Sequence, residues 1–417
     1  MCQLRPVRLV RRARRPIRRV GNATNGRPAA MTAKVTSIAS VRAAARDRAE
    51  MLKANNRAAT TLLVVVVVLV VVGLGATQSA SSAVALDRTE DSLFFFKRQL
   101  VGVGLGTLAL LITSRIPYQF YRRIAVPLFL LTIGLLGAVL LVGTEINGAR
   151  RWLTLPLLSF QPSEVAKVSV VFVLAYLLER KHKLLNRFGH FIVPVLATVG
   201  LVGLLIIKQP DLGTLIVIGA AALAVIMASN APMKYVFALG LAAVFVTTVF
   251  AFSESYRADR ITAFLDPYAD SSGDGYQVIQ GYYALGNGGL FGVGLGASRA
   301  RWFYLPNAHT DFIFAIIGEE TGLVGGLTVF GLFVVLGLAG WAVASRAPDP
   351  FGRMVAAGIT VWLSFQALIN IGGVLGVVPI TGIALPFVSF GSTDLIVSMA
   401  ALGVLVNIAQ SGVHGKP

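Results

Sequence analysis

Long runs of apolar residues recur along the chain, and short polar segments separate them. A helix needs roughly 20 apolar residues to cross the hydrocarbon core of a bilayer, and about ten of the runs approach that length. The first extends from about Ala59 to Thr77. The centres of the others lie near Leu105, Leu131, Phe172, Val199, Ala220, Ala243, Val329, Ala367 and Leu402. The pattern predicts an all-α, polytopic membrane protein with about ten transmembrane helices.

Two of these runs and one connection carry further signals. The eighth run, from about Phe312 to Val343, is the longest, and we expect it to be tilted or broken at Gly322, Gly325 and Gly326. The first run lies too far from residue 1, and lacks the cleavage context, to be a signal peptide. The large outer loop between runs seven and eight, residues 253–311, is the longest connection. Its many aromatic residues argue against disorder, so we predict a folded cap that contains short helices.

Composition supports a membrane protein and excludes several other classes. Of the 417 residues, 55% are hydrophobic and only 13% are charged, whereas soluble domains carry about 25% charged residues. The single cysteine, Cys2, excludes a disulfide framework and a cysteine-based metal site. The spacing of the runs predicts one transmembrane domain over residues 58–417.

The net charge of +18 is concentrated in a basic arm that precedes the first run. A basic arm can bind nucleic acid, but beside a membrane span we favour attachment to an anionic cytoplasmic leaflet. The arm, residues 1–57, is poor in aromatic residues, and we predict that it is disordered. Met31 and Met51 are alternative starts.

The distribution of basic residues among the short loops predicts the orientation in a bacterial cytoplasmic membrane. With the arm in the cytoplasm, both termini and most basic loops lie inside, and the 253–311 loop lies outside. The inner basic residues are Arg115, Arg122, Arg123, Arg180, Lys181, Lys183, Arg187, Lys234, Arg346 and Arg353. Two basic pairs fall outside against this rule, Lys97-Arg98 and Arg150-Arg151, which suggests that they have local roles.

The large outer loop contains the first candidate for chemistry. Asp266 and Asp270 lie four residues apart in Asp-Pro-Tyr-Ala-Asp, and Gln277 follows. A carboxylate can act as a general base toward a substrate hydroxyl, and two close carboxylates can hold a divalent cation. Asp, Pro and Gly also form ordinary turns, so the residues alone leave a structural role open.

Other polar groups lie at or near the outer ends of the predicted spans. Glu164 and Lys167 share one face of the fourth span and can neutralise each other. Charges inside spans are costly and commonly functional. Arginine pairs can clamp phosphate oxygens. The remaining candidates for binding are Arg150, Arg151, Trp152, Lys208, His309, Asp311, Glu319 and Ser389. Simple alternatives remain open for Asp311 as a helix cap and for His309 as a solvated loop residue.

Several of these residues stand in motifs that occur in a known order. They are Lys97-Arg98-Gln99-Leu100, Asn147-Gly148-Ala149-Arg150-Arg151-Trp152, Gln161-Pro162-Ser163-Glu164, Gln209-Pro210-Asp211, Phe264-Leu265-Asp266-Pro267, Gly275-Tyr276-Gln277, His309-Thr310-Asp311-Phe312 and Pro386-Phe387-Val388-Ser389. From about Ala59 onward the chain resembles the SEDS family, which includes FtsW, RodA and SpoVE. The resemblance is closest to the FtsW members, which act in cell division.

The resemblance implies an inverting peptidoglycan glycosyltransferase that polymerises lipid II on the outer face of the membrane, at the division septum. The family's essential loop Asp corresponds to Asp270, its functional Trp to Trp152, and its Glu-Lys pair to Glu164 and Lys167. The implied partners are lipid II, a class B penicillin-binding protein and other division proteins, with no nucleic acid. Mg²⁺ or Mn²⁺ held by Asp270 and Asp266 is the one cofactor expected. A lipid II flippase and a non-catalytic division scaffold are the alternatives.

Two positions depart from the family pattern. Ser271 stands where members often carry proline, so the acidic turn is expected to be looser. Asp394 enters the last span where the family has a Gly-Gly-Ser segment, and an acidic residue is unexpected there.

Overall fold

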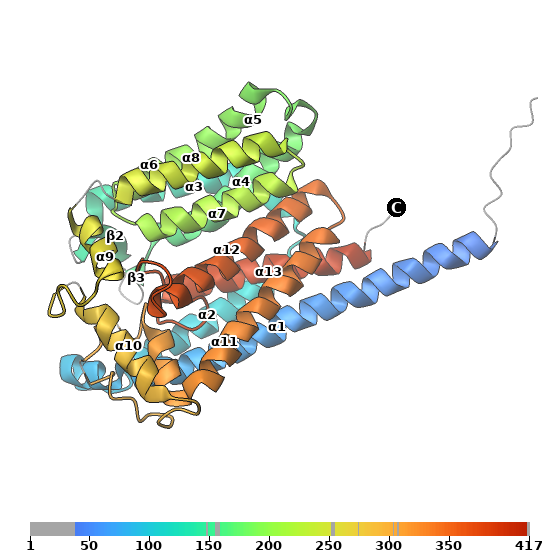
Figure 1. Ribbon diagram of the computed structural model, residues 1–417. Helices are drawn as coiled ribbons and strands as arrows, with labels where there is room; N and C mark the ends of the chain where they lie inside the picture. The colour runs from blue at the N-terminus through green and yellow to red at the C-terminus, as the bar shows by residue number, and fades with distance from the viewer. Residues whose placement is uncertain are drawn as a thin grey trace, which may run out of the picture. The chain divides into compact units, whose positions relative to one another are not determined.

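The computed structural model describes residues 38–146, 149–154, 159–251, 255–273, 275–302, 304–306 and 308–414. Helices dominate this part of the chain, as predicted (Figure 1). The long helices are α1 (Ile38–Thr89), α2 (Phe94–Arg115), α3 (Gln119–Val142), α4 (Pro162–Arg180), α7 (Leu212–Ala228), α8 (Met233–Ala251), α11 (Ile313–Ser345), α12 (Pro350–Val374) and α13 (Ser392–His414). One further helical stretch joins α5 (Phe188–Val195), the π-helix η2 (Leu196–Gly200) and α6 (Leu201–Ile207), after the short 3₁₀ turn η1 (His182–Leu184).

The centres of all ten predicted spans fall inside these helices. Within the described residues, eight helices are long and apolar enough to cross a membrane, and α7, with 17 residues, is a shorter apolar helix. The one remaining predicted span, the fourth, is α4, which carries Glu164 and Lys167 in its first two turns. The chain is therefore a multi-pass membrane protein, while the count of ten spans stays a prediction.

The first helix begins earlier than the sequence pattern suggested. α1 starts at Ile38 and continues without a break to Thr89. The predicted boundary at residue 58 therefore lies inside a helix, while the disorder of the arm stays a prediction. Helix-forming residues such as the alanines and arginines of this segment account for the difference. Residues 1–37 lie outside the described part.

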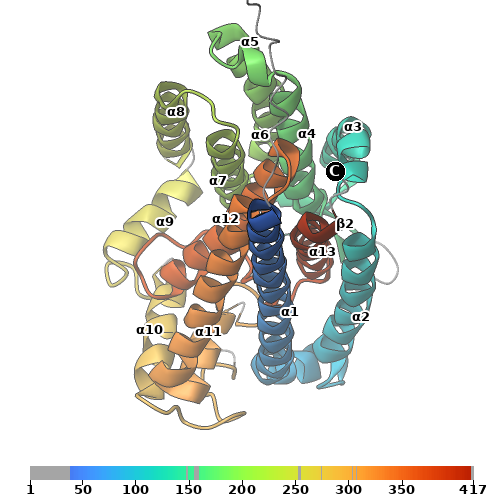
Figure 2. The ribbon, with the colours of Figure 1, turned by 90° about the vertical axis from the view of Figure 1, so that its right-hand side faces the viewer.

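α12 and α13 form the interior of the helical bundle. In the 18-residue apolar stretches of α12 and α13, 72% and 78% of the residues are buried. The corresponding share for α8, at the periphery, is 6% (Figure 2). α13 packs along α2, where Gly102 and Gly106 face it. A methyl group on Gly106 would lie 2.6 Å from the sulfur of Met399. Small residues therefore allow the close approach of these two helices.

A small antiparallel sheet follows α3 on the outer-loop side. It comprises β1 (Thr144–Ile146), β2 (Ala149–Thr154) and β3 (Ser159–Phe160), in the order β1-β2-β3. The pattern of apolar and polar residues did not predict these strands. Its strands are short and contain charged residues, so the alternation that marks a strand is weak.

The large outer loop contains two helices, α9 (Ser255–Leu265) and α10 (Tyr276–Gly288). The prediction of short helices in this connection is therefore confirmed. α10 packs against the beginning of α11, and the acidic turn from Asp266 to Asp270 lies between α9 and α10 (Figure 1).

α11 is interrupted at Gly322, as predicted. Gly322 has φ 68° and ψ −166°, a conformation that essentially only glycine adopts. The outer loop supplies hydrogen bonds across the break. Val293 N and Gly294 N donate to the carbonyls of Glu319 and Glu320 at 3.0 and 3.1 Å. In return, the N–H groups of the first two residues after the break donate to the loop carbonyls of residues 289 and 290. We call these four bonds the loop clasp.

Candidate functional site

The acidic turn between α9 and α10 is held by its own backbone. The side chain of Asp266 accepts a hydrogen bond from Tyr268 N at 3.1 Å, and that of Asp270 accepts one from Gly273 N at 3.0 Å. A methyl group on Gly273 would lie 2.1 Å from a carboxylate oxygen of Asp270, and one on Gly275 would lie 1.9 Å from the carbonyl oxygen of Pro267. The two glycines are therefore required for the position of Asp270. Asp274 between them lies outside the described residues.

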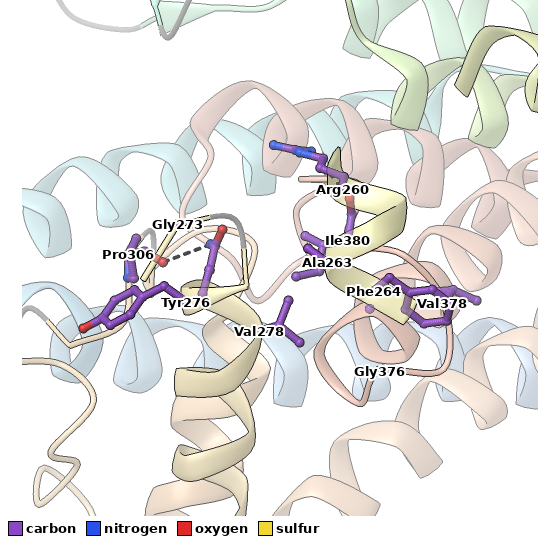
Figure 3. Close-up of a pocket in the computed structure, with 12 residues that line it drawn as sticks. Arg260, Ala263, Phe264, Gly273, Tyr276, Val278, Pro306, Gly376, Val378 and Ile380 are labelled. Carbon is purple, nitrogen blue, oxygen red and sulfur yellow. Dashed lines mark hydrogen bonds between the residues drawn. The ribbon is translucent and has the colours of Figure 1, made fainter. Parts of the chain in front are cut away.

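A cavity of about 260 Å³ adjoins this turn. α9, the start of α10, and the end of α12 with the segment after it form its walls (Figure 3). Gln277 lies in the wall and donates from Nε2 to the carbonyl oxygen of Pro306 at 3.2 Å. The lining residues are Arg260, Ala263, Phe264, Gly273, Tyr276, Gln277, Val278, Pro306, Gly373, Gly376, Val378 and Ile380. Aromatic rings, an amide and a guanidinium in one concave surface suit a polar ligand such as a sugar.

Arg260 is the cation among the described residues that line this cavity, and no motif in the sequence predicted it. Its guanidinium donates to the carbonyl oxygen of Ile380 at 3.5 Å. A methyl group on Gly382 would lie 3.7 Å from Nη1 of Arg260 and 3.8 Å from Oδ2 of Asp311, so the two charges flank the same glycine. Burial raises the pKa of Asp311, and the positive charge of Arg260 partly offsets this. Asp311 does not line this cavity but a second, much smaller pocket of about 10 Å³, which shares Gly373 and Ile380 with it.

Glu164 and Lys167 form an ion pair inside the bundle, with Nζ and Oε2 2.5 Å apart. Asp394 joins them, 3.2 Å from Nζ of Lys167. From α12, Gln366 accepts a hydrogen bond from Lys167 at 2.9 Å, and Nζ lies 5.1 Å from the centre of the Trp362 ring. We call Glu164, Lys167 and Asp394 the buried triad. The unexpected Asp394 is thus a partner of the predicted pair.

The triad is connected to the loop that ends near the cavity. Gln366 donates from Nε2 to Oδ1 of Asp394 at 3.2 Å and to the carbonyl oxygen of Ala384 at 3.0 Å. Because α4, α12 and α13 each contribute to this network, it fixes three helices and the 375–391 segment relative to one another. In this geometry Glu164 and Lys167 contact other side chains of the bundle, and their role in substrate binding stays a prediction.

The predicted phosphate clamp on the β-sheet has other contacts. Arg151 donates from its guanidinium to the backbone carbonyls of Gln209, at 2.9 Å, and Pro210. Arg150 is exposed and forms an ion pair with Glu145 at 3.4 Å. Lys208 is exposed, and Trp152 is partly buried in β2. None of Arg150, Arg151, Trp152 and Lys208 is among the described residues that line the cavity.

Glu319 and Glu320 point to different neighbours, so they do not form a paired acidic site. Glu319 accepts hydrogen bonds from the hydroxyl of Ser298 and from the backbone N–H groups of Arg299 and Ala300, the latter two at 3.2 and 3.3 Å. Glu320 accepts a bond from the hydroxyl of Ser79 in α1. Both carboxylates fix the outer loop and α1 to α11.

His309 and Ser389 lie beside α2, in a region held by packed aromatic rings and by hydrogen bonds. The His309 ring packs against those of Phe95 and Phe390, with ring centres 4.8 and 5.8 Å away, and the two phenylalanine rings also contact each other. Burial, assisted by the nearby charge of Arg88, lowers the pKa of His309 to about 4, so its ring is neutral at pH 7. Ser389 donates to the carbonyl oxygen of Thr310 and accepts from Leu385 N. These contacts hold both residues in place, and their role in binding stays a prediction.

Whether the protein could bind a divalent cation depends on which side chains are grouped closely enough to be its ligands. Within the described ranges, no three His, Cys, Asp or Glu side chains are grouped as a metal site. Asp266 and Asp270 fit a cation only if substrate oxygens supply the remaining ligands, which is how Mg²⁺ is often held.

The geometry defines a class: a multi-pass membrane protein with an acidic turn and a polar cavity in its large outer loop. Comparisons with known proteins give the family. The model of the FtsW/RodA/SpoVE cell cycle proteins matches residues 59–413. The probable peptidoglycan glycosyltransferase FtsW of a Geobacter species is 39% identical over 339 residues, covering 81% of this chain and 92% of that protein. The stage V sporulation protein E of Bacillus subtilis is 41% identical over 341 residues, covering 81% and 93%.

Solved structures agree with the sequence relatives. A chain of a peptidoglycan synthase complex that coordinates polymerization and crosslinking matches with a TM-score of 0.70 and 32% identity, covering 85% of this chain and 98% of that chain. The rod-shape-determining protein RodA of Thermus thermophilus matches with a TM-score of 0.64 and 28% identity, covering 84% and 96%. The chain belongs to the FtsW/RodA/SpoVE family.

Proposed function

We propose that this protein is a peptidoglycan glycosyltransferase that polymerises lipid II into glycan strands on the outer face of the cytoplasmic membrane during cell division. The carrying observation is the acidic turn, whose Asp270 is held by Gly273 at the edge of a polar cavity. Family membership and relatives named as glycosyltransferases support the same activity.

The proposed reaction is a displacement at an anomeric carbon. The 4-hydroxyl of lipid II forms a new bond to that carbon, and the bond from the donor sugar to its lipid diphosphate breaks. Attack from the opposite face inverts the α-linkage to a β-linkage. Asp270 accepts the hydroxyl proton as general base.

The departing diphosphate requires positive charge nearby. Arg260 is the cation that the cavity itself supplies. Arg150 and Lys208 are exposed and are further candidates to stabilise the departing diphosphate. A Mg²⁺ or Mn²⁺ ion at Asp266 and Asp270 would supply the same charge neutralisation when bound. Arg151 instead positions the sheet, because its guanidinium contacts two backbone carbonyls.

The proposal extends to partners and place. The similar chain in the synthase complex supports a class B penicillin-binding protein as a transpeptidase partner. Relatives named FtsW favour the division septum and other division proteins, with both termini in the cytoplasm. Lipid II is the substrate in this scheme.

The test is polymerisation of labelled lipid II by purified protein with its transpeptidase partner, resolved on a gel. Wild type, Asp270→Asn and Asp266→Asn are compared, with and without chelator. Asp91→Asn is the matched control, because Asp91 is an outer carboxylate that pairs with Lys97 away from the cavity. We expect polymer from wild type and Asp91→Asn and none from a folded Asp270→Asn. Full polymer from Asp270→Asn would refute the assignment.

The alternatives predict different outcomes. A lipid flippase needs a charged path open to both faces, whereas the triad is buried, with Lys167 only 1% exposed. A flippase would move labelled lipid II across vesicles without forming polymer. A non-catalytic scaffold would leave polymerisation by the complex unchanged in the Asp270→Asn protein.

A further inference from the structure

The segment that joins α10 to α11 presents a row of apolar side chains that the described residues of the protein leave exposed. Leu290, Phe291, Val293 and Leu295 are 62%, 81%, 45% and 83% exposed. No Asp, Glu, Lys or Arg occurs from Gly288 to Ala297. Four large apolar side chains within six residues are unusual for a loop in water. We call Leu290 to Leu295 the apolar loop.

The backbone of the apolar loop is hydrogen-bonded, which is unusual for an irregular segment. The loop clasp satisfies two loop N–H groups and two loop carbonyls against α11. Gly292 N donates to the carbonyl of Gly288 at 2.7 Å, and Ala297 N donates to that of Gly294 at 3.1 Å. Positive φ angles make these turns possible, with values of 81° and 107° at Gly292 and Gly294. Irregular backbone enters a low-dielectric region only when its polar groups are satisfied in this way.

The loop clasp also sets the depth of the apolar loop. The helix from Gly322 to Ser345 is about 24 residues and about 36 Å long, enough to cross a bilayer alone. The break at Gly322 therefore lies near the membrane boundary on the outer-loop side, and the clasp holds the apolar loop at the same level. The first residues after the break, Leu323, Val324 and Leu327, are exposed and apolar, as a lipid-facing span requires.

We propose that the apolar loop inserts into the outer-leaflet interface of the membrane and is covered by lipid. Its surface continues that of Leu323 and Val324, which face lipid as part of a span. The exposed Arg299, which follows the loop, can reach anionic headgroups from the interface. The proposal does not depend on the catalytic one, because none of these residues lines the cavity.

The test measures the surroundings of single labelled positions. In a chain carrying Cys2→Ser, Leu295→Cys and Phe291→Cys are each labelled with bimane and reconstituted into phosphatidylcholine–phosphatidylglycerol nanodiscs, without partner proteins. Nitroxide-labelled lipid and aqueous iodide serve as quenchers. Leu338→Cys, at an exposed position of α11, is the lipid control. Tyr268→Cys, at an exposed position of the acidic turn, is the water control.

We expect both loop positions to be quenched by nitroxide lipid as strongly as position 338, or more strongly where the nitroxide lies near the headgroups, and to resist iodide. Iodide quenching equal to that at position 268 would overturn the proposal. Protection from both quenchers would also overturn it, because it would show that protein covers the loop. Two labelled positions guard against a variant that does not fold.

Discussion

The buried triad allows a sharp test of how charge is balanced inside this membrane protein. Two carboxylates, Glu164 and Asp394, share one ammonium group, Lys167. The three residues are only 6%, 9% and 1% exposed. Replacing Lys167 by Met keeps an unbranched side chain one atom shorter and removes the charge, whereas replacing Asp394 by Ser leaves one intact ion pair. The two variants should therefore differ strongly in stability.

The magnitudes follow from the contacts. Lys167→Met removes both ion pairs and the hydrogen bond to Gln366, and removal of one partner from a buried pair costs about 3–5 kcal/mol. Asp394→Ser loses contacts to Lys167 and Gln366 at 3.2 Å, each worth about 1 kcal/mol. It also removes a carboxylate that has no ammonium of its own, which offsets that loss. We expect a net change within about 1 kcal/mol for Asp394→Ser.

The assay is thermal unfolding of the purified, detergent-solubilised protein, followed by tryptophan fluorescence and by retention of the monodisperse peak. Glu164→Gln with Asp394→Ser, combined in one chain, serves as a reference in which Lys167 has no carboxylate partner. Lys167→Met should lower the unfolding midpoint far more than Asp394→Ser. Equal destabilisation by the two variants would show that Lys167 does not balance the charges of Glu164 and Asp394 as proposed.

Three further substitutions test other parts of the structure. His309→Phe should flatten the pH dependence of unfolding between pH 6.5 and 4, because below pH 6.5 the unfolded chain binds a proton that the folded wild type, with a pKa of about 4, does not. The free energy of unfolding of the wild type therefore falls by about 3 kcal/mol as the pH falls from 6.5 to 4. Gly322→Ala should destabilise by at least about 2 kcal/mol, because a methyl group would lie 2.4 Å from Gly292 N at a φ of 68°. Gly273→Ala should abolish polymerisation with little change in unfolding midpoint, because it displaces the Asp270 carboxylate.

Each of these has a matched comparison. Gly331→Ala in α11 and Gly286→Ala in α10 place a methyl group where nothing lies within 4 Å, so both should behave as wild type. If Gly322→Ala were as stable as Gly331→Ala, the break would not require glycine. Polymerisation by Gly273→Ala equal to that of Gly286→Ala would contradict the positioning of Asp270. An unchanged pH slope in His309→Phe would remove His309 as the titrating group.

The apolar pattern predicted most of the helices because crossing a bilayer demands length and hydrophobicity, which are local properties of the sequence. The break at Gly322 was also predictable, since three glycines within five residues weaken a helix. The β-sheet was not, because its strands are stabilised by contacts such as Arg151 with the carbonyls of Gln209 and Pro210, which lie far away in the sequence.

The candidate site was predicted only in part, for a similar reason. Asp266, Asp270 and Gln277 stand in one local motif. Gln277 lines the cavity, and Asp270 accepts a hydrogen bond from Gly273, which also lines it. Arg260 precedes that motif without a recognisable spacing, and the return of the 375–391 segment brings the carbonyl oxygen of Ile380 to it. Asp394 was noticed as unusual, but its role depends on packing of α13 against α4, which no local pattern records.

The contact between Gly322 and Gly292 has an evolutionary consequence. Each glycine leaves room for the backbone of the other segment: a methyl group on Gly322 would meet Gly292 N, and one on Gly292 would meet the Glu320 carbonyl at 2.1 Å. Neither position can therefore acquire a side chain by a single mutation without separating the two segments. Neither glycine can be replaced unless the opposite segment changes at the same time. Insertions and deletions in related proteins should therefore accumulate outside residues 288–294 and 318–324.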